Sequence, residues 1–282
     1  MNDHAGGGLP AAGTPRESTG RRRAPLPTRV DDLPPLPPGY LRALDAGLAA
    51  IPLTLTAEAR AAISAHVSLL LAWSPAINLT SIREPELVAT RHVIDSLTAV
   101  PLIAARLRNH GAPLRLLDIG SGGGYPGLPI AAAVPGSEVV LLDSVAKKAR
   151  FLETAASAAG LADRVAVVGE RAEAIAPRVR SGAVRPFDVV TARAIGSLGD
   201  LLELSFPLLA AGGALTAWKR GDLADEIRAA TRAMTALGGG SIAVHEVAVA
   251  GLDGHRLVLA EKAGPTPGGF PREPARRRSQ PW

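Results

Sequence analysis

The stretch Leu116–Gly127, LLDIGSGGGYPG, decides the fold of this 282-residue chain. An apolar run at 114–119 carries an acid, Asp118, near its end. Four glycines then follow within five positions, at 120, 122, 123 and 124. Glycine lets the backbone turn tightly and lets a ligand approach it closely. The stretch therefore predicts a strand, a ligand-binding turn and a helix, in that order.

Short apolar runs continue beyond this turn and alternate with helical patterns. They lie at 138–143, 164–169, 187–192 and 214–219, followed by SIAVHEVAVA (241–250) and HRLVLAEK (255–262). Continuous apolar runs of this length are typical of strands covered on both faces. Strands that alternate with helices indicate a doubly wound α/β fold. We expect a Rossmann-like, seven-stranded, mostly parallel sheet.

The rest of the chain divides by composition. Thr56 is a good helix N-cap and Pro85 suits the first turn of a helix, so an N-terminal helical region is expected. The first 38 residues are rich in Gly and Pro and predict a disordered arm. The expected units are an arm at 1–38, a helical region at 39–110, a Rossmann-like domain at 111–262 and a basic Pro/Gly/Arg-rich tail at 263–282.

Composition excludes several kinds of site. The chain has no cysteine, which rules out disulfides, thiolate metal ligands and cysteine nucleophiles. No run of about 18 apolar residues is long enough to span a membrane, and no apolar signal region follows the N-terminal arginines. We expect a cytoplasmic protein with no metal and no membrane partner.

The net charge of +5 lies in the two ends of the chain. Residues 1–38 carry about +1 and residues 262–282 about +4, whereas the part between them holds 21 basic and 21 acidic residues. The high isoelectric point is therefore weak evidence for nucleic acid, because the folded part is close to neutral.

Three kinds of ligand fit a glycine-rich turn between a strand and a helix. A nucleoside triphosphate loop needs a Lys followed by Ser or Thr, which is absent here. The dinucleotide pattern GxGxxG matches 122–127 but starts too late, because its first glycine belongs at the strand end. Asp118 would repel a pyrophosphate and suits an ammonium group. The order acid-x-Gly-x-Gly-x-Gly is typical of class I S-adenosylmethionine-dependent methyltransferases.

Two more acids fall where such a cofactor would lie. Asp143 ends the second expected strand, where an acid can accept the ribose hydroxyls, although it can also cap the next helix. Glu173 follows the third strand with Ala172, where methyltransferases hold the adenine, and it can equally be a solvated acid in a helix start. Asp118, Gly120, Gly122 and Asp143 are the expected cofactor contacts at this point.

The residues also narrow the methyl acceptor. Methylation at pyrimidine C5 usually needs a cysteine, and exocyclic amines usually need an Asp/Asn-Pro-Pro-aromatic stretch, whereas residues 191–194 read Thr-Ala-Arg-Ala. Guanine N7 has a free lone pair and needs no general base. Arg193 then serves to position cofactor or phosphate, and His92 is a candidate beside the acceptor. His92, Asp95 and Ser96 share a helix face, so a structural polar network is the alternative.

These residues together resemble one family. LLDIGSGGGYPGLPIA, LLDSVAKKARFLE, ERAEAIA, FDVVTARAIGSLGDLLELSFPLLAAGG and NLTSIREPELVATRHVIDSL are similar to the RsmG (GidB) family of bacterial 16S rRNA guanine-N7 methyltransferases. The resemblance covers about residues 40 to 262. It implies methylation of guanine 527 of 16S rRNA by S-adenosylmethionine, with the small ribosomal subunit or its assembly intermediate as partner. The cofactor contacts that it implies are Gly120, Tyr125, Ala172, Glu173 and Arg193.

The same resemblance shows departures and leaves the RNA contacts open. The family's Lys-Gly after the fifth strand is Lys219-Arg220-Gly221 here, and its C-terminal TPxxYPRxxGxP pattern survives only in part over 266–272. Candidate phosphate contacts are the basic side chains Lys147, Lys148, Arg150 and Lys219, although a run of charges is usually a solvated face.

Three rival functions remain open from the residues alone. They are a nicotinamide-dependent oxidoreductase on the same sheet, a methyltransferase of small molecules or proteins, and a non-catalytic RNA-binding protein. Asp118 argues against the first, and the intact loop glycines and acids argue against the last.

Overall fold

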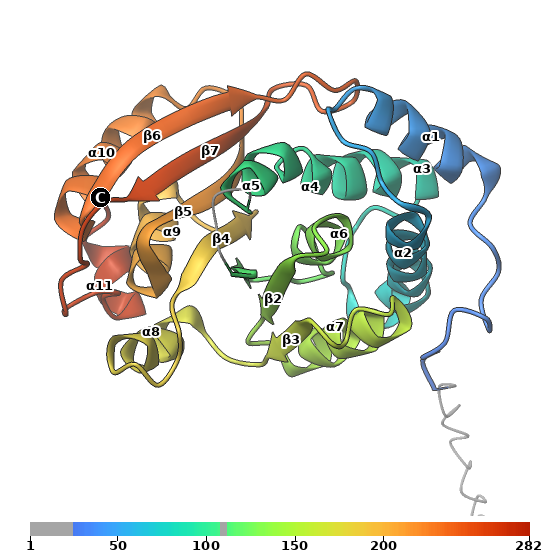
Figure 1. Cartoon of the computed structure of the whole chain (residues 1–282), viewed down its shortest axis with the longest axis horizontal. Coiled ribbons are helices and arrows are strands. Elements are labelled where there is room, and N and C mark those ends of the chain that lie inside the picture. Colours follow the sequence, from blue (N-terminus) through green and yellow to red (C-terminus); the bar gives the residue numbers. More distant parts are fainter. Residues whose placement is uncertain (1–24, 108–111) are drawn as a thin grey trace, which may run out of the picture.

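The sheet of this protein has seven strands in the order β3-β2-β1-β4-β5-β7-β6 (Figure 1). The structure is a computed structural model that describes residues 25–107 and 112–282. Every neighbouring pair is parallel except those of β7, which runs antiparallel to β5 and β6. The strands are β1 (Leu114–Ile119), β2 (Ser137–Leu142), β3 (Val165–Val168), β4 (Phe187–Arg193), β5 (Leu209–Arg220), β6 (Gly239–Glu246) and β7 (His255–Lys262). The expected fold class is confirmed.

Helices cover both faces of the sheet, and the sheet separates the hydrophobic core into two clusters. Side chains alternate along a strand, so Leu116 of β1 packs with α2, α6 and α7, whereas Leu117 packs with α8, α9 and α10. These helices are α2 (Ala57–Ile77), α6 (Gly127–Ala133), α7 (Ala146–Ala158), α8 (Ala172–Arg180), α9 (Leu198–Ser205) and α10 (Ala224–Leu237). Both faces of the central strands are therefore buried, as their continuous apolar sequences predict.

The N-terminal helices form a helical wall that packs on α6 and α7. Thr56 caps α2 as expected, because its hydroxyl accepts the N–H of Ala59 at 3.2 Å. The other helical segments are α1 (Pro38–Ala49), α3 (Pro85–Val88), a π-helical segment at Ala89–Ile94, α4 (Asp95–Leu97) and α5 (Val100–Leu107). Wider π turns are frequent at functional sites, and this one carries His92.

Within the described residues one helical run, Pro85–Arg106, is long and apolar enough to cross a membrane. More than half of its most apolar window, 56%, is buried inside the protein, and core helices pass the same test. The run packs against α1, so its apolar face is accounted for by the fold.

The N-terminal end of the described chain differs from the expectation. Residues 25–37 pack on the helical wall through four apolar side chains, Leu26, Val30, Leu33 and Leu36, and the indole N–H of Trp73 donates to the carbonyl of Pro27 at 2.7 Å. The expected disordered arm is therefore wrong for 25–37, because these four residues find an apolar surface; residues 1–24 lie outside the described residues. At the other end, α11 (Pro274–Ser279) lies beside α9 (Figure 1).

Trp73→Phe tests the packing of residues 25–37. The variant keeps the aromatic ring and loses the hydrogen bond to Pro27, which contributes about 1 kcal/mol. We expect native-state trypsin cleavage after Arg29 to become about fivefold faster. Trp282→Phe is the matched control, because its indole donates to Glu203 instead and Arg29 cleavage should not change. Equal cleavage rates in wild type and Trp73→Phe would contradict the packing.

Candidate functional site

Asp118 holds the ends of the glycine-rich turn together. Its Oδ1 accepts the hydroxyl of Thr191 on β4 at 2.8 Å, and its Oδ2 accepts the N–H of Gly127 at the start of α6 at 3.1 Å. The side chain is 0% exposed. The expected direct contact between Asp118 and a cofactor ammonium is therefore wrong, because no part of the carboxyl reaches the surface. Asp118 is a positioning residue for the turn.

Burial also governs the proton equilibrium of Asp118. Desolvation raises the pKa of the carboxyl from 3.8 to about 6, while the hydrogen bonds from Thr191, Ser121 and Gly127 act in the opposite direction. At neutral pH the group is still mainly ionised, and its negative charge lies inside the protein just behind the turn.

Asp143 connects the same turn to the next helix. Its Oδ2 accepts the N–H of Gly122 at 2.9 Å, and its Oδ1 accepts the N–H of Val145, which caps α7, at 2.9 Å. The sequence predicted two roles for this acid, a ribose contact and a helix cap, and both require its position at the carboxyl edge of the sheet. The structure shows a bond to the residue before α7 but no side-chain cap on the helix itself, and the ribose contact stays a prediction.

His66 of α2 supports the turn from the opposite side. Its Nε2 donates to the carbonyl of Gly123 at 2.7 Å, and its ring lies 4.6 Å from that of Tyr125. Burial lowers the pKa of His66 to about 4, so the ring is neutral at pH 7. The Nδ1 atom is buried without a hydrogen-bond partner among the described residues. The helical wall therefore shapes the turn directly.

Tyr125 lies between two histidines at the end of the turn. Its ring stacks on His92 at 4.9 Å and 27°, and the guanidinium of Arg193 lies 5.4 Å from its centroid. Like His66 on the other side, these groups enclose the ring, which is nearly fully buried. The side chain of Tyr125 thus packs the turn against β4, and a ligand contact by this residue stays a prediction.

A buried acid, Asp95, joins the helical wall to the carboxyl edge of the sheet. Its Oδ2 accepts from Arg193 Nη1 of β4 at 3.0 Å, and its Oδ1 accepts from His255 Nδ1 of β7 at 2.9 Å. Its backbone carbonyl accepts the indole N–H of Trp218 of β5 at 2.7 Å. Three strands and one helix therefore meet at a single residue, as the polar-network alternative predicts for Asp95.

His92 is neutral in this arrangement. His92 Nδ1 lies 3.2 Å from both Arg193 Nη2 and the carbonyl of Arg91, and Nε2 lies 2.7 Å from Thr80 Oγ1. Burial first, and the Arg193 charge second, lower the pKa of His92 to about 4. Both ring nitrogens are engaged within the protein, and His92 lines the cavity described next.

These residues line a cavity of about 520 Å³ at the carboxyl ends of β4 and β5. It is bounded by Arg91, His92, Asp95, Arg193, Ala194, Ile195, Gly196, Trp218, Lys219, Arg220 and His255. Ile195 also lies over Gly120, where an added Cβ would meet its Cδ1 at 2.3 Å. The side chain of Ile195 therefore contacts the glycine-rich turn and also lines the cavity.

Lys219 does not match its expected role as an RNA contact. Its Nζ donates to Glu226 at 2.5 Å and to the carbonyl of Gly196 at 3.0 Å, and the side chain is only 11% exposed. The ammonium is neutralised inside the protein, so this part of the expectation is wrong. Lys147 and Arg150 are exposed on α7 and Lys148 is half-buried there, which leaves them as predictions.

The third expected cofactor region lies at the start of α8. Ala172 is buried and Glu173 is half-buried, directly after β3. Gly120, Gly122, Asp143, Ala172, Glu173 and Arg193 thus all lie at the carboxyl ends of β1 to β4, the edge where open α/β sheets bind ligands. Among the described residues no three His, Cys, Asp or Glu side chains form a metal site.

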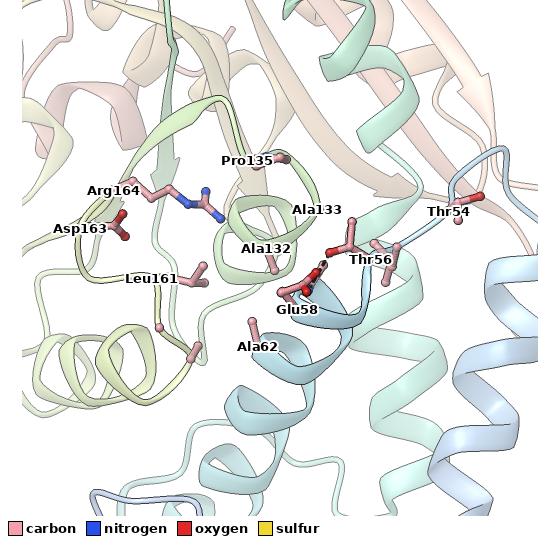
Figure 2. Close-up of a pocket in the computed structure, with 14 residues that line it drawn as sticks. Thr54, Thr56, Glu58, Ala62, Ala132, Ala133, Pro135, Leu161, Asp163 and Arg164 are labelled. Atoms are coloured by element: carbon pink, nitrogen blue, oxygen red, sulfur yellow. Dashed lines mark hydrogen bonds between the residues drawn. The ribbon is translucent and has the colours of Figure 1, made fainter.

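A second cavity, of about 420 Å³, lies at the opposite edge of the sheet (Figure 2). Figure 2 shows Arg164 and Asp163 on one side of it, and Thr56 and Glu58, at the start of α2, on the other. The segments before β2 and β3 line it, so it is remote from the carboxyl edge. None of the motifs in the sequence contributes to it, whereas the cavity beside the turn is lined by motif residues.

Comparison with known proteins agrees with this geometry. The family model GidB, described as rRNA small subunit methyltransferase G, matches residues 59–253.

This chain belongs to the GidB family.

Curated relatives include the ribosomal RNA small subunit methyltransferase G of Roseiflexus castenholzii, 40% identical over 73% of this chain and 86% of the relative. That of Geobacillus kaustophilus is 36% identical over 80% of this chain and 92% of the relative. A solved O-methyltransferase from Bacillus cereus, in complex with SAH, is similar in fold only, with a TM-score of 0.51 and 18% identity over 78% of this chain and 97% of that chain. The resemblance seen in the sequence is confirmed.

Two histidines of this GidB site were missed by the sequence reasoning. His66 is 57 residues from the glycine whose carbonyl it holds, and His255 is 160 residues from Asp95. A signal for His255 exists, because an antiparallel strand begins at the edge where its parallel neighbours end. His255 pairs with Arg220, the last residue of β5, and so starts β7 at the site. No local pattern marks His66.

The low pKa of His66 predicts a dependence of stability on pH. The folded pKa of about 4 lies below the usual 6.5, so the unfolded chain binds more protons between these values. The contribution of His66 to the free energy of unfolding, about 3 kcal/mol, is present above pH 6.5 and is lost as the pH falls through 4.

His66→Gln isolates this contribution, because a Gln amide can donate to Gly123 without titrating. We expect the urea-measured stability of the variant to fall less than that of wild type between pH 6.5 and 4. The raised pKa of Asp118 acts with the opposite sign between pH 3.8 and 6 and cancels, because both proteins contain it. Parallel stability curves would contradict the prediction.

Proposed function

We propose that this chain methylates N7 of a guanine in 16S rRNA, guanine 527, with S-adenosylmethionine as methyl donor. The observation that carries the proposal is the direct contact between the glycine-rich turn and a basic cavity, through Ile195 and Tyr125. Family membership supports methylation of small-subunit rRNA. The cofactor and the base within the rRNA are the inferred parts.

The residues at the carboxyl edge fit this cofactor. Gly122 has a left-handed φ of 57°, and an added Cβ would meet only the carbonyl of Gly120, at 3.7 Å, so its backbone borders open space. Asp143 and Glu173 offer carboxylates for the nucleoside, and Arg193, whose charge is balanced by Asp95, borders the methionine end. Gly120, Tyr125 and Ala172 complete the set that would hold the cofactor.

The acceptor side needs orientation more than proton transfer. When bound, S-adenosylmethionine supplies a methyl group on a sulfonium, which the lone pair of guanine N7 accepts without loss of a proton. The protein therefore holds the base and excludes water. His92 is neutral and hydrogen-bonded, which is compatible with a transfer that needs no general base. His255 donates through Nδ1 to Asp95, and because His255 lines the cavity we assign its Nε2 to contact the base.

The RNA itself must present a splayed or exposed guanine to this cavity. Its phosphates require cations outside the cavity. Of the cations after residue 261, Lys262 is buried on two carbonyls, and Arg272 and Arg277 are paired with acids. Arg276 and Arg278 remain exposed. We infer that these two, together with Lys147 and Arg150 of α7, supply phosphate contacts.

Mapping of N7-methylguanosine tests the proposal. We expect the modification at guanine 527 of 16S rRNA in cells with the gene, its absence after deletion and its return on complementation. Purified protein with labelled S-adenosylmethionine should label small-subunit particles or 16S rRNA and not free metabolites. A methyl group at another atom, label on a metabolite, or binding of NADH in place of S-adenosylhomocysteine would overturn the proposal.

Salt dependence tests the phosphate contacts. Four contacts to single-stranded RNA give a slope of about −3 in log affinity against log salt, a loss of about fiftyfold between 50 and 200 mM. Lys147→Gln and Arg150→Gln should each reduce the slope by about 0.7, whereas Arg232→Gln, exposed on α10, should not. Affinity that stays constant over this range would show that these cations do not contact RNA.

A further inference from the structure

The chain after β7 is fixed to the body of the protein. It leaves the sheet past α10, where Thr266 donates its hydroxyl to the carbonyl of Leu237 at 3.0 Å. It then crosses α9 and forms α11 (Figure 1). This segment lies beyond residue 253, where the match to the family model ends. Its role therefore has to be argued from its own contacts.

A buried acid of α9, Glu203, is the anchor. Its side chain is 0% exposed and accepts from the backbone N–H of Arg272 at 2.6 Å, from the guanidinium of the same residue at 2.6 Å, and from the indole of Trp282 at 2.8 Å. The guanidinium also lies over the Trp282 ring, 4.7 Å from its centroid. Breaking a buried pair of this kind costs several kcal/mol, so the tail has one defined position.

This position brings α11 to the start of α8. Arg277 Nη2 donates to Glu173 Oε1 at 2.5 Å, and the two side chains are 12% and 22% exposed. The second oxygen of that carboxylate, Oε2, makes no hydrogen bond within the described residues. The acid is thus held at one oxygen and free at the other, beside the carboxyl end of β3.

Arg277 differs from the arginines on either side of it. Arg276 and Arg278 are exposed, whereas Arg277 Nη1 is buried and has no hydrogen-bond partner in the described part of the chain. An unpaired buried N–H is costly, and a surface pair would not require it. The contact with Glu173 is therefore a specific feature of the tail rather than a loose surface ion pair.

We propose that Arg277 is a positioning residue for the cofactor site: it fixes the Glu173 carboxylate so that Oε2 meets the nucleoside end of the cofactor. The tail is then a wall of that site, held in place by Glu203. The inference rests on the proposed function, because it takes Glu173 as a cofactor contact. The alternative, a staple between α8 and α11 with no effect on ligand, would change stability alone.

Arg277→Gln in the full chain separates these roles. Without the cation, Glu173 samples several rotamers, and we expect the Kd for S-adenosylhomocysteine, measured by calorimetry, to rise three- to tenfold. The KM for S-adenosylmethionine should rise by the same factor, with kcat changed less than twofold. In the ligand-free protein, the amides of residues 172–176 should exchange hydrogen faster. Arg277→Lys should restore part of the affinity, because an ammonium can still donate to Oε1.

Arg232→Gln is the control, because it removes the same charge from an exposed position on α10, to which no cofactor or RNA contact is assigned. Its Kd should equal that of wild type. An unchanged Kd in Arg277→Gln would overturn the inference and leave the proposed function intact, as would equal weakening by both variants, which would indicate a general effect of charge. A wild-type protein that binds no S-adenosylhomocysteine would overturn the proposed function and the inference together.

Discussion

The shape of the glycine-rich turn depends on one buried carboxylate, that of Asp118. It ties β1 to β4 through Thr191 and to the first turn of α6 through the N–H of Gly127. A Cβ at residue 127 would lie 2.8 Å from the carboxylate and 2.3 Å from Leu141. Residue 127 must therefore be glycine for α6 to begin this close to the sheet. The acid itself is buried behind the turn, and the turn borders open space at Gly122.

The N-terminal helices contribute side chains that the site needs. α2 supplies His66, which hydrogen-bonds to the carbonyl of Gly123 in the turn, and the π-helical segment supplies His92, which packs on Tyr125. Asp95, one turn later, connects the same helical wall to β4 and β7. The cavity beside the turn is therefore lined both by the N-terminal helices and by the sheet. A change in the packing of these helices will move side chains that line the cavity.

Much of the fold follows from local sequence, because apolar runs and the glycine cluster identify strands and the turn wherever they occur. The edge of the sheet at which Asp118 and Asp143 lie was predictable for the same reason. The direction of each side chain was not, since it depends on partners on other strands, and Asp118 points inward to Thr191. Composition also failed for residues 25–37, where four spaced apolar side chains match a surface formed by distant helices.

The pairing of Glu203 has a consequence for the order of events during protein synthesis. Its partner Arg272 lies 69 residues later in the chain, so at about 5–20 residues per second the acid waits between about 3 and 14 s for its counter-charge. A lone carboxylate resists burial. The inner face of α9 can therefore close only after the arginine has left the ribosome, which makes the docking of the tail one of the last steps in the maturation of this enzyme.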